Sequence, residues 1–198
     1  AQEAYTRALE AESPEALGGI AQRATKDLAF RADRTAEALG SLSRLASGLG
    51  PVLETAVGDV RAAEAQEWQA LRRDLLRLAE DKGAVGLPEP EPAAPDEWMQ
   101  RAEGMVLRRL FRGPVGPREL LARLEPADQA AARELMESHR EVARALPVLM
   151  VYWLDGRRNL LEVADLVECE VGKRDLEFMV RAAELMERAG LLERVSGV

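Results

Sequence analysis

Two long stretches of helical periodicity, separated by a turn rich in Gly and Pro, most constrain the fold of this 198-residue chain. The first begins at Ser13-Pro14-Glu15, where Ser can cap a helix, Pro suits its first position and Glu favours its positive end. Residues 48–51, Gly-Leu-Gly-Pro, predict where this helix ends and the next begins. The positions recurring at three- and four-residue spacing are Leu17, Ile20, Ala24, Leu28, Thr35, Leu39, Leu42 and Ala46, then Leu53, Val57, Val60, Trp68, Leu71, Leu75 and Leu78.

Two apolar-faced helices joined by a short turn predict a long antiparallel helical hairpin over residues 1–82. Each arm is expected to be roughly 45–50 Å long at about 1.5 Å per residue. Two such helices leave apolar surface uncovered, so we expect a second copy of the chain to cover it in a homodimer. The predicted dimer seam consists of Leu39, Leu42, Val57, Val60, Leu71, Leu75 and Leu78.

The remainder of the chain divides into a linker and a second helical domain. Residues 83–96, GAVGLPEPEPAAPD, are predicted to be extended and stiff because their prolines prevent a regular helix. Residues 97–198 are predicted to form the helical domain, which makes the fold mainly α. We expect a helix from Trp98 to Arg112, a short helix over residues 118–124, and a helix from Pro126 to about Ala145. The side chains expected to pack inward from the first of these are Met105, Val106, Leu107, Leu110 and Phe111.

The last stretch, residues 147–198, has the order of elements of a small winged helix. An apolar helix is followed by an Asp155-Gly156 turn, two further helices, and then a Gly before an apolar strand. The strand Leu191–Val195 is expected to pair with the segment after Asp155-Gly156, since that pairing closes the small sheet of a winged helix.

A winged helix raises DNA binding, and the charges of the predicted recognition helix, residues 175–189, bear on it. Its expected outer face alternates Glu177, Arg181, Glu184 and Arg188, which can pair with one another at helical spacing. The preceding helix exposes acidic residues, and the net charge of the whole chain is −8. Phosphates would be repelled by such a surface, so nucleic acid is not the expected partner. Two small basic clusters could instead contact an acidic partner, and they consist of Arg157, Arg158, Lys173 and Arg174.

Catalytic and metal chemistry have few candidate residues in this chain, which holds one His and one Cys. His139 has no second His with which to form a metal site, so we interpret it as a surface or capping residue. Cys169 lies among carboxylates, which raise a thiol's pKa, and it is interpreted as a buried structural residue. The sequence therefore predicts no catalytic site, no metal and no cofactor.

The stretch YWLDGRRNLLEVADLVECEVG, with the later DLEFMVRAAELMERAGLLE, resembles the C-terminal region of bacterial zinc aminopeptidases related to aminopeptidase S. In that family a helical tail follows a di-zinc catalytic domain. The resemblance implies that this chain is the accessory part, because none of the zinc ligands can be placed on it. The same pattern also resembles small winged helices that hold peptide precursors, which implies peptide binding by an added strand.

These observations predict a non-catalytic protein-interaction and oligomerisation module, with a protein or peptide as its partner. The alternative is a winged-helix transcription regulator that dimerises through the hairpin. No apolar run approaches the roughly 20 residues that span a bilayer, so no membrane association is expected. A single Cys and the lack of a visible signal peptide favour the cytoplasm.

Overall fold

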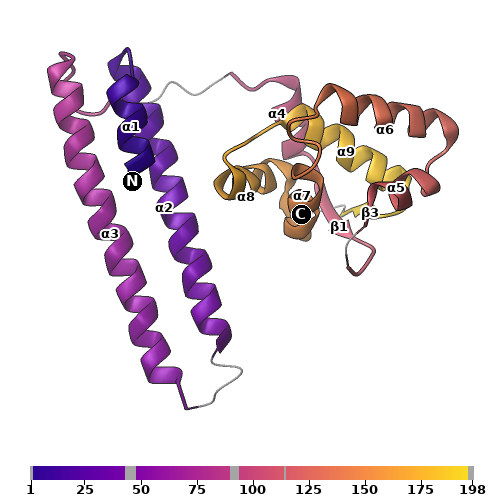
Figure 1. Cartoon of the computed structure of the whole chain (residues 1–198), viewed down its shortest axis with the longest axis horizontal. Coiled ribbons are helices and arrows are strands. Elements are labelled where there is room, and N and C mark those ends of the chain that lie inside the picture. The colour runs from indigo at the N-terminus through magenta and orange to yellow at the C-terminus, as the bar shows by residue number, and fades with distance from the viewer. Residues whose placement is uncertain (1, 43–47, 90–93, 114, 196–198) are drawn as a thin grey trace. The chain divides into compact units, whose positions relative to one another are not determined.

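The computed structural model describes residues 2–42, 48–89, 94–113 and 115–195, and the chain divides into two compact units, residues 1–93 and 94–198. The fold is mainly α, as predicted, with one small antiparallel sheet in the second unit (Figure 1). The predictions for Ala46 and for residues 90–93 of the linker lie outside the described residues.

The first unit is built on the predicted hairpin. Its helices are α1 (Gln2–Glu10), α2 (Pro14–Leu42) and α3 (Gly50–Asp81). The long helices α2 and α3 run antiparallel, side by side (Figure 1). An ion pair between Asp33 on α2 and Arg61 on α3 links the two arms.

Helix α1 covers one end of this hairpin, which the sequence reading did not anticipate. It packs against both α2 and α3. Part of the predicted linker joins this core, since Ala84 and Leu87 pack against it and the Ala84 amide donates to the Ala79 carbonyl at 2.9 Å. The core that these contacts enclose comprises Ala8, Ala11, Leu17, Ala21, Ala24, Leu71, Leu75 and Ala79.

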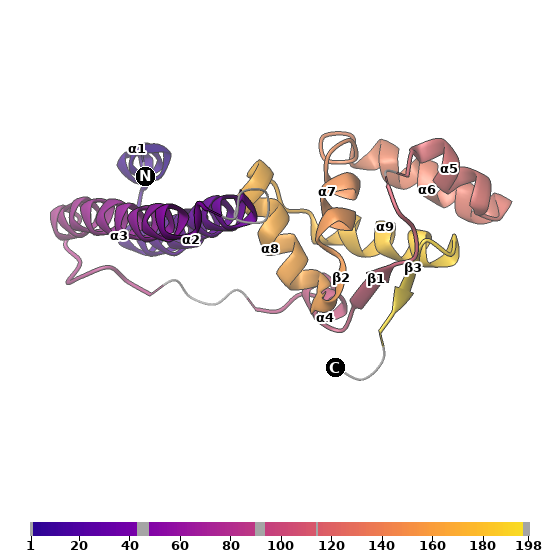
Figure 2. The same cartoon turned by 90° about the horizontal axis from the view of Figure 1, so that it is seen from below.

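The second unit surrounds one central helix, α9. Its elements are α4 (Glu97–Glu103), β1 (Val106–Arg109), α5 (Pro117–Arg123), α6 (Pro126–Ser138), α7 (Leu146–Trp153), β2 (Asp155–Asn159), α8 (Leu160–Val171), α9 (Leu176–Arg188) and β3 (Leu192–Arg194). Helix α9 contacts α4, α6, α7, α8 and β3. Figure 2 shows it between the strands on one side and α5 with α6 on the other. Because α9 packs on several sides, Phe178, Met179 and Val180 are all buried.

The prediction of one helix from Trp98 to Arg112 was wrong. Helix α4 ends at Glu103, and Gly104 caps it before β1 begins at Val106. Met105 and Leu107 are buried while Arg108 is exposed, which is the two-residue alternation of a strand. Leu110, expected inside, is 51% exposed. Pairing with two distant strands decides this segment, and local helical spacing does not reveal such pairing.

The predicted pairing of the last strand was also wrong. The order of the sheet is β2-β1-β3, so β1 lies between the two strands that were expected to pair. Arg108 lies opposite Asp155 on one side and Glu193 on the other. The helix predicted to run to about Ala145 ends at Ser138, and turns occupy residues 139–145.

Local hydrogen bonds fix the ends of the two helices after β2, which the sequence predicts in that order. Asn159 and Glu162 form a capping box at the start of α8, with hydrogen bonds of 2.9 and 2.8 Å. Gly172 ends α8 with φ of +69°, a conformation that favours glycine. The Asp175 carboxylate accepts from the Phe178 amide at 2.9 Å and caps α9. In the described part of the chain, no helix combines the length and apolarity needed to cross a bilayer.

Candidate functional site

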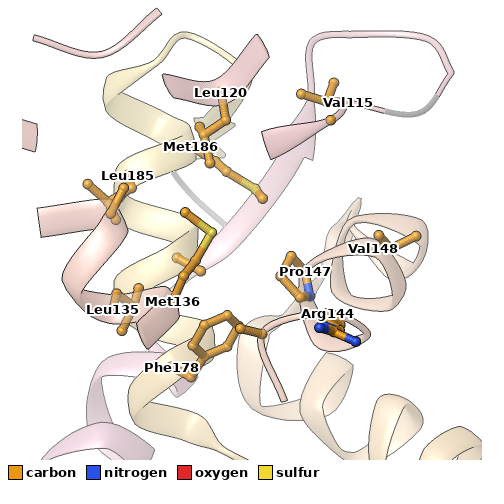
Figure 3. Close-up of a pocket in the computed structure, with 14 residues that line it drawn as sticks. Val115, Leu120, Leu135, Met136, Arg144, Pro147, Val148, Phe178, Leu185 and Met186 are labelled. Atoms are coloured by element: carbon orange, nitrogen blue, oxygen red, sulfur yellow. The ribbon is translucent and has the colours of Figure 1, made fainter. Parts of the chain in front are cut away.

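The candidate site is an apolar cavity of about 370 Å³ in the second unit (Figure 3). It lies among α6, α9, the start of α5 and the turn that leads into α7. The lining residues are Val115, Gly116, Leu120, Ala132, Leu135, Met136, Ala143, Arg144, Pro147, Val148, Phe178, Ala182, Leu185 and Met186.

The spacing of side chains on α9 and α6 explains why this space is empty. Phe178, Ala182, Leu185 and Met186 follow one face of α9 at four- and three-residue spacing. Ala182 contributes only a methyl group between the larger side chains, and Ala132 of α6 is equally small. Side chains in protein interiors normally fill such space to crystal-like density. The facing small residues therefore leave room that the chain's own atoms do not occupy.

The chemistry of the lining suits an apolar group. Apart from Arg144, every lining side chain is apolar or absent. The side chains of Met136 and Met186 point into the space between the helices (Figure 3). Methionine is flexible and polarisable, so a methionine-lined surface adapts to differently shaped partners. The volume lies at the lower end of the range typical for small-ligand or side-chain pockets, roughly 300–1,000 Å³.

Arg144 is the one charged residue of the lining, and it lies in the turn before α7. Its side chain is exposed, and among the described residues it makes no ion pair or hydrogen bond. Several other arginines of this unit are paired, for example Arg188 with Asp128 at 2.6 Å and Arg181 with Glu177 at 3.0 Å, whereas Arg118 and Arg157, like Arg144, have no ion pair among the described residues. Arg144 therefore places an uncompensated positive charge beside an apolar cavity.

Helix α7 extends the apolar surface beyond the cavity. Val148, which lines the cavity, is 64% exposed, and Tyr152, one turn further along, is 57% exposed. Both belong to the helix Leu146–Trp153, in which every residue is apolar or aromatic. Exposed apolar side chains that continue a pocket are typical of a protein-binding surface.

A cluster of polar side chains surrounds His139, which contacts the cavity residue Phe178. Its Nε2 is 3.7 Å from Asp175 Oδ2, its Nδ1 is 2.9 Å from Ser138 Oγ, and its ring is 5.6 Å from that of Phe178. The three residue types are those of a catalytic triad, but Ser138 Oγ is held by the carbonyl of Glu134 at 2.9 Å. The hydroxyl therefore belongs to the end of α6, and the cluster joins α6 to α9. His139 is the residue that caps α6, and its side chain is only 17% exposed.

The prediction for Cys169, the one thiol of the sequence, was only partly right. Cys169, expected to be buried, is half-buried on α8. Across residues 2–42, 48–89, 94–113 and 115–195, no group of three or more His, Cys, Asp or Glu side chains is arranged to hold a metal ion.

The two predicted basic clusters occupy separate places in the second unit. Arg158 pairs with Asp155 at 2.7 Å, and its guanidinium lies 5.8 Å from the centre of the Trp153 ring. Arg174 pairs with Asp165 and Glu168 on α8. Lys173 lies 3.7 Å from Glu141, and Arg157 is exposed on β2. Three of these four cations thus have carboxylate partners within the chain, and none of these ion pairs joins one cluster to the other.

Asp155 is the group that organises the first of these clusters. Burial raises its pKa, but the Arg158 and Arg157 amides and the Arg158 charge outweigh burial and hold the pKa of Asp155 below its ordinary value. The amides of Arg157 and Arg158 donate to its Oδ1 at 2.9 and 3.1 Å. Gly156 has φ of +79°, and a Cβ there would lie 3.3 Å from Arg108 Cβ. Asp155 and Gly156 thus begin β2 and do not form the predicted turn, because Asp155 pairs with Arg108 of β1.

The predicted dimer seam is divided by the structure into two parts. Leu71 and Leu75 are only 3% and 0% exposed, because α1 and α2 cover them within the first unit. The premise that they form an uncovered stripe was therefore wrong. Leu42 is 43% exposed, whereas the four remaining members are half-buried, and these are Leu39, Val57, Val60 and Leu78.

The charged face predicted for residues 175–189 is partly self-paired and partly used in packing. Glu177 pairs with Arg181 on the same helix, as its spacing suggests. Glu184 instead pairs with Arg101 of α4, and Arg188 pairs with Asp128 of α6. These ion pairs attach α9 to its neighbours, so two members of the face serve the tertiary structure.

The cavity was not predicted from the sequence. Its only signal was the combination of small and methionine residues on the inner face of residues 175–189, which reads equally well as ordinary core. In comparisons with known proteins, no family model, no curated protein and no solved structure matches the chain.

Proposed function

We propose that this chain is a non-catalytic protein-interaction module whose second unit receives an apolar segment of a protein or peptide partner. The observation that carries the proposal is the apolar cavity of about 370 Å³, which the chain's own side chains leave empty. Water in such a space makes few hydrogen bonds, so an apolar group that displaces it gains hydrophobic free energy. The exposed Val148 and Tyr152 enlarge the surface that a partner would cover.

The alternative, a winged-helix transcription regulator, receives less support. A recognition helix must present one face to the major groove. Here α9 contacts five other elements, and two of its outward charges, Glu184 and Arg188, are paired with neighbouring helices. The acidic net charge of −8 also opposes binding to phosphates. A protein partner fits these features better than a DNA duplex.

Self-association of the hairpin is the second part of the proposal. Helix α1 covers one end of the α2–α3 pair, and three exposed apolar residues lie beside the turn at the other end. Leu42, Leu49 and Val52 are 43%, 44% and 66% exposed there. A second copy that packs on this end would remove these side chains from water, at roughly 25 cal/mol per Å² of apolar area.

A peptidase-like parent protein and a cytoplasmic location remain predictions. The first rests on the resemblance of residues 152–172 and 175–193 to the tail of zinc aminopeptidases, and the second on the single Cys. The complete open reading frame tests whether the parent protein is peptidase-like. A di-zinc peptidase domain upstream would have its own His, Asp and Glu ligands.

The cavity itself can be tested with the neutral fluorescent probe N-phenyl-1-naphthylamine. Binding to the whole chain should raise its fluorescence, and Ala182→Leu and Ala143→Leu should reduce this rise by filling the cavity from two sides. Ala122→Leu on the exposed side of α5 is the matched control. Each variant is first shown to unfold cooperatively. Equal fluorescence for wild type and both filled variants would remove the basis of the proposal.

A further inference from the structure

We infer that the partner segment is an amphipathic helix that carries an acidic residue, and that this residue pairs with Arg144 while apolar side chains enter the cavity. This inference rests on the proposed function, which requires only that an apolar segment binds. The inference adds that the bound segment is a helix and that this helix carries a negative charge.

The negative charge of the partner segment is inferred from the residues that line the cavity. Arg144 is the only charged residue among the fourteen that line the cavity, and it has no carboxylate partner within the described chain. A carboxylate placed beside it would gain a charge-assisted hydrogen bond, which is stronger than a neutral one. A basic segment would instead place like charges together beside a surface of low polarity. The complementary occupant is therefore acidic where it leaves the cavity.

The helical form of the partner segment is inferred from the residues that follow Arg144 along the chain. Arg144 lies in the turns that lead into α7, whereas Val148 and Tyr152 are four residues apart on α7 itself. Residues at this spacing lie along one side of a helix. Val148 lines the cavity, but Tyr152 is 57% exposed and outside the lining, so a small molecule that filled the cavity would leave Tyr152 uncovered. A helix laid along α7 can cover both and still insert a side chain, which is the helix-in-groove mode of recognition.

The test begins with a display library of short helical peptides in which every outward position is randomised. Peptides are selected on the whole chain and counter-selected on the Ala182→Leu and Ala143→Leu variants. The expected result is enrichment of aliphatic residues at four-residue spacing with Asp or Glu at one neighbouring position. Selected peptides that bind the wild type and fail to bind both filled variants support the proposed function.

Arg144 is then tested on the selected peptides. Arg144→Gln should weaken binding about three- to tenfold, as expected for an ion pair that is partly shielded from water. Replacing the acidic residue of the peptide by Gln should have little further effect in the Arg144→Gln background, which is the signature of a direct pair. Arg118→Gln, an exposed arginine on α5 outside the cavity, should leave the affinity unchanged.

The outcomes distinguish the proposed function, which is binding of an apolar segment, from the further inference, which is an acidic helix that pairs with Arg144. Cavity-dependent peptides without an acidic preference, or with equal affinity for Arg144→Gln, overturn the inference and leave the proposed function in place. A selection that yields no cavity-dependent peptide overturns both. In that case, titration with dodecanoate and dodecanol is decisive, since Arg144-dependent binding of dodecanoate alone would identify a small apolar acid as the ligand.

Discussion

His139 Nε2 lies 3.7 Å from Asp175 Oδ2, and this contact joins the end of α6 to the start of α9. Both residues also have local roles, because His139 caps α6 and Asp175 caps α9 through the Phe178 amide. The ring of His139 covers Phe178, a fully buried residue that lines the cavity. One interaction thus joins two helices that both line the candidate site.

His139→Ala is expected to lower the free energy of unfolding by about 1 kcal/mol, because it removes one partly buried polar contact and the packing against Phe178. Urea denaturation followed by circular dichroism measures this change. Arg140→Ala, at the next and exposed position, is the matched control and should change stability by less than about 0.5 kcal/mol. An equal effect of the two substitutions would contradict a structural role for the His139–Asp175 contact.

The isolated chain is expected to hydrolyse no peptide substrate, with or without added zinc. The expectation rests on the single His and single Cys of the sequence, and on Ser138 Oγ, which is bound to the main chain of α6. The assay uses leucine p-nitroanilide and a mixture of short peptides, with the product amine measured over hours. Turnover that survives repurification and disappears in His139→Ala would show that the His139 cluster is catalytic.

Stability should fall at acid pH partly through Asp155. Its pKa is lower in the folded chain than in the unfolded chain, so its contribution is fully present above its ordinary pKa. That contribution is lost as the pH falls from about 4 through the lowered folded value. Asp155→Asn should therefore reduce stability at pH 7, by under about 1 kcal/mol for this exposed pair, and should flatten the acid slope. Thermal melts between pH 2 and 7 test this, and an unchanged slope would contradict it.

The chain is expected to form a homodimer through the turn end of its hairpin. Leu42→Glu should shift the mass to that of a monomer at micromolar concentration, because a charge in an apolar interface is left unpaired. Static light scattering measures the mass. Leu71→Glu should behave differently, since Leu71 is buried within one chain and the substitution should unfold the first unit. A monomer mass for the wild type would remove the dimer from the proposal.

Binding to a random DNA duplex should be undetectable at low salt, where electrostatic attraction is strongest. The expectation rests on the acidic net charge and on the paired charges of α9. A fluorescence-anisotropy titration with labelled duplex is sufficient. Micromolar binding that weakens steeply with added salt would indicate release of counterions from phosphates, and the regulator function would then replace the one proposed.

Local chemistry in the sequence was enough to predict the mainly α fold, the hairpin and the two helices after β2. The signals at Ser13-Pro14 and at residues 48–51 lie within a few residues of the helix ends that they predict. The structure adds two local signals of the same kind, the capping box of Asn159 with Glu162 and the glycine cap at Gly172. Helix periodicity and capping depend on such short-range contacts, so they can be read without knowledge of distant segments.

Three features depended on contacts between distant segments. The segment around Leu107 became the central strand because β2 and β3 pair on its two sides. Leu71 and Leu75 became core because α1 folds back over the hairpin, although their spacing suits an intermolecular seam equally well. The cavity beside Arg144 arises where α6, α9 and the turn before α7 meet without filling the space between them. Strand pairing, burial and unfilled volume are properties of the assembled fold, so only the tertiary structure could decide them.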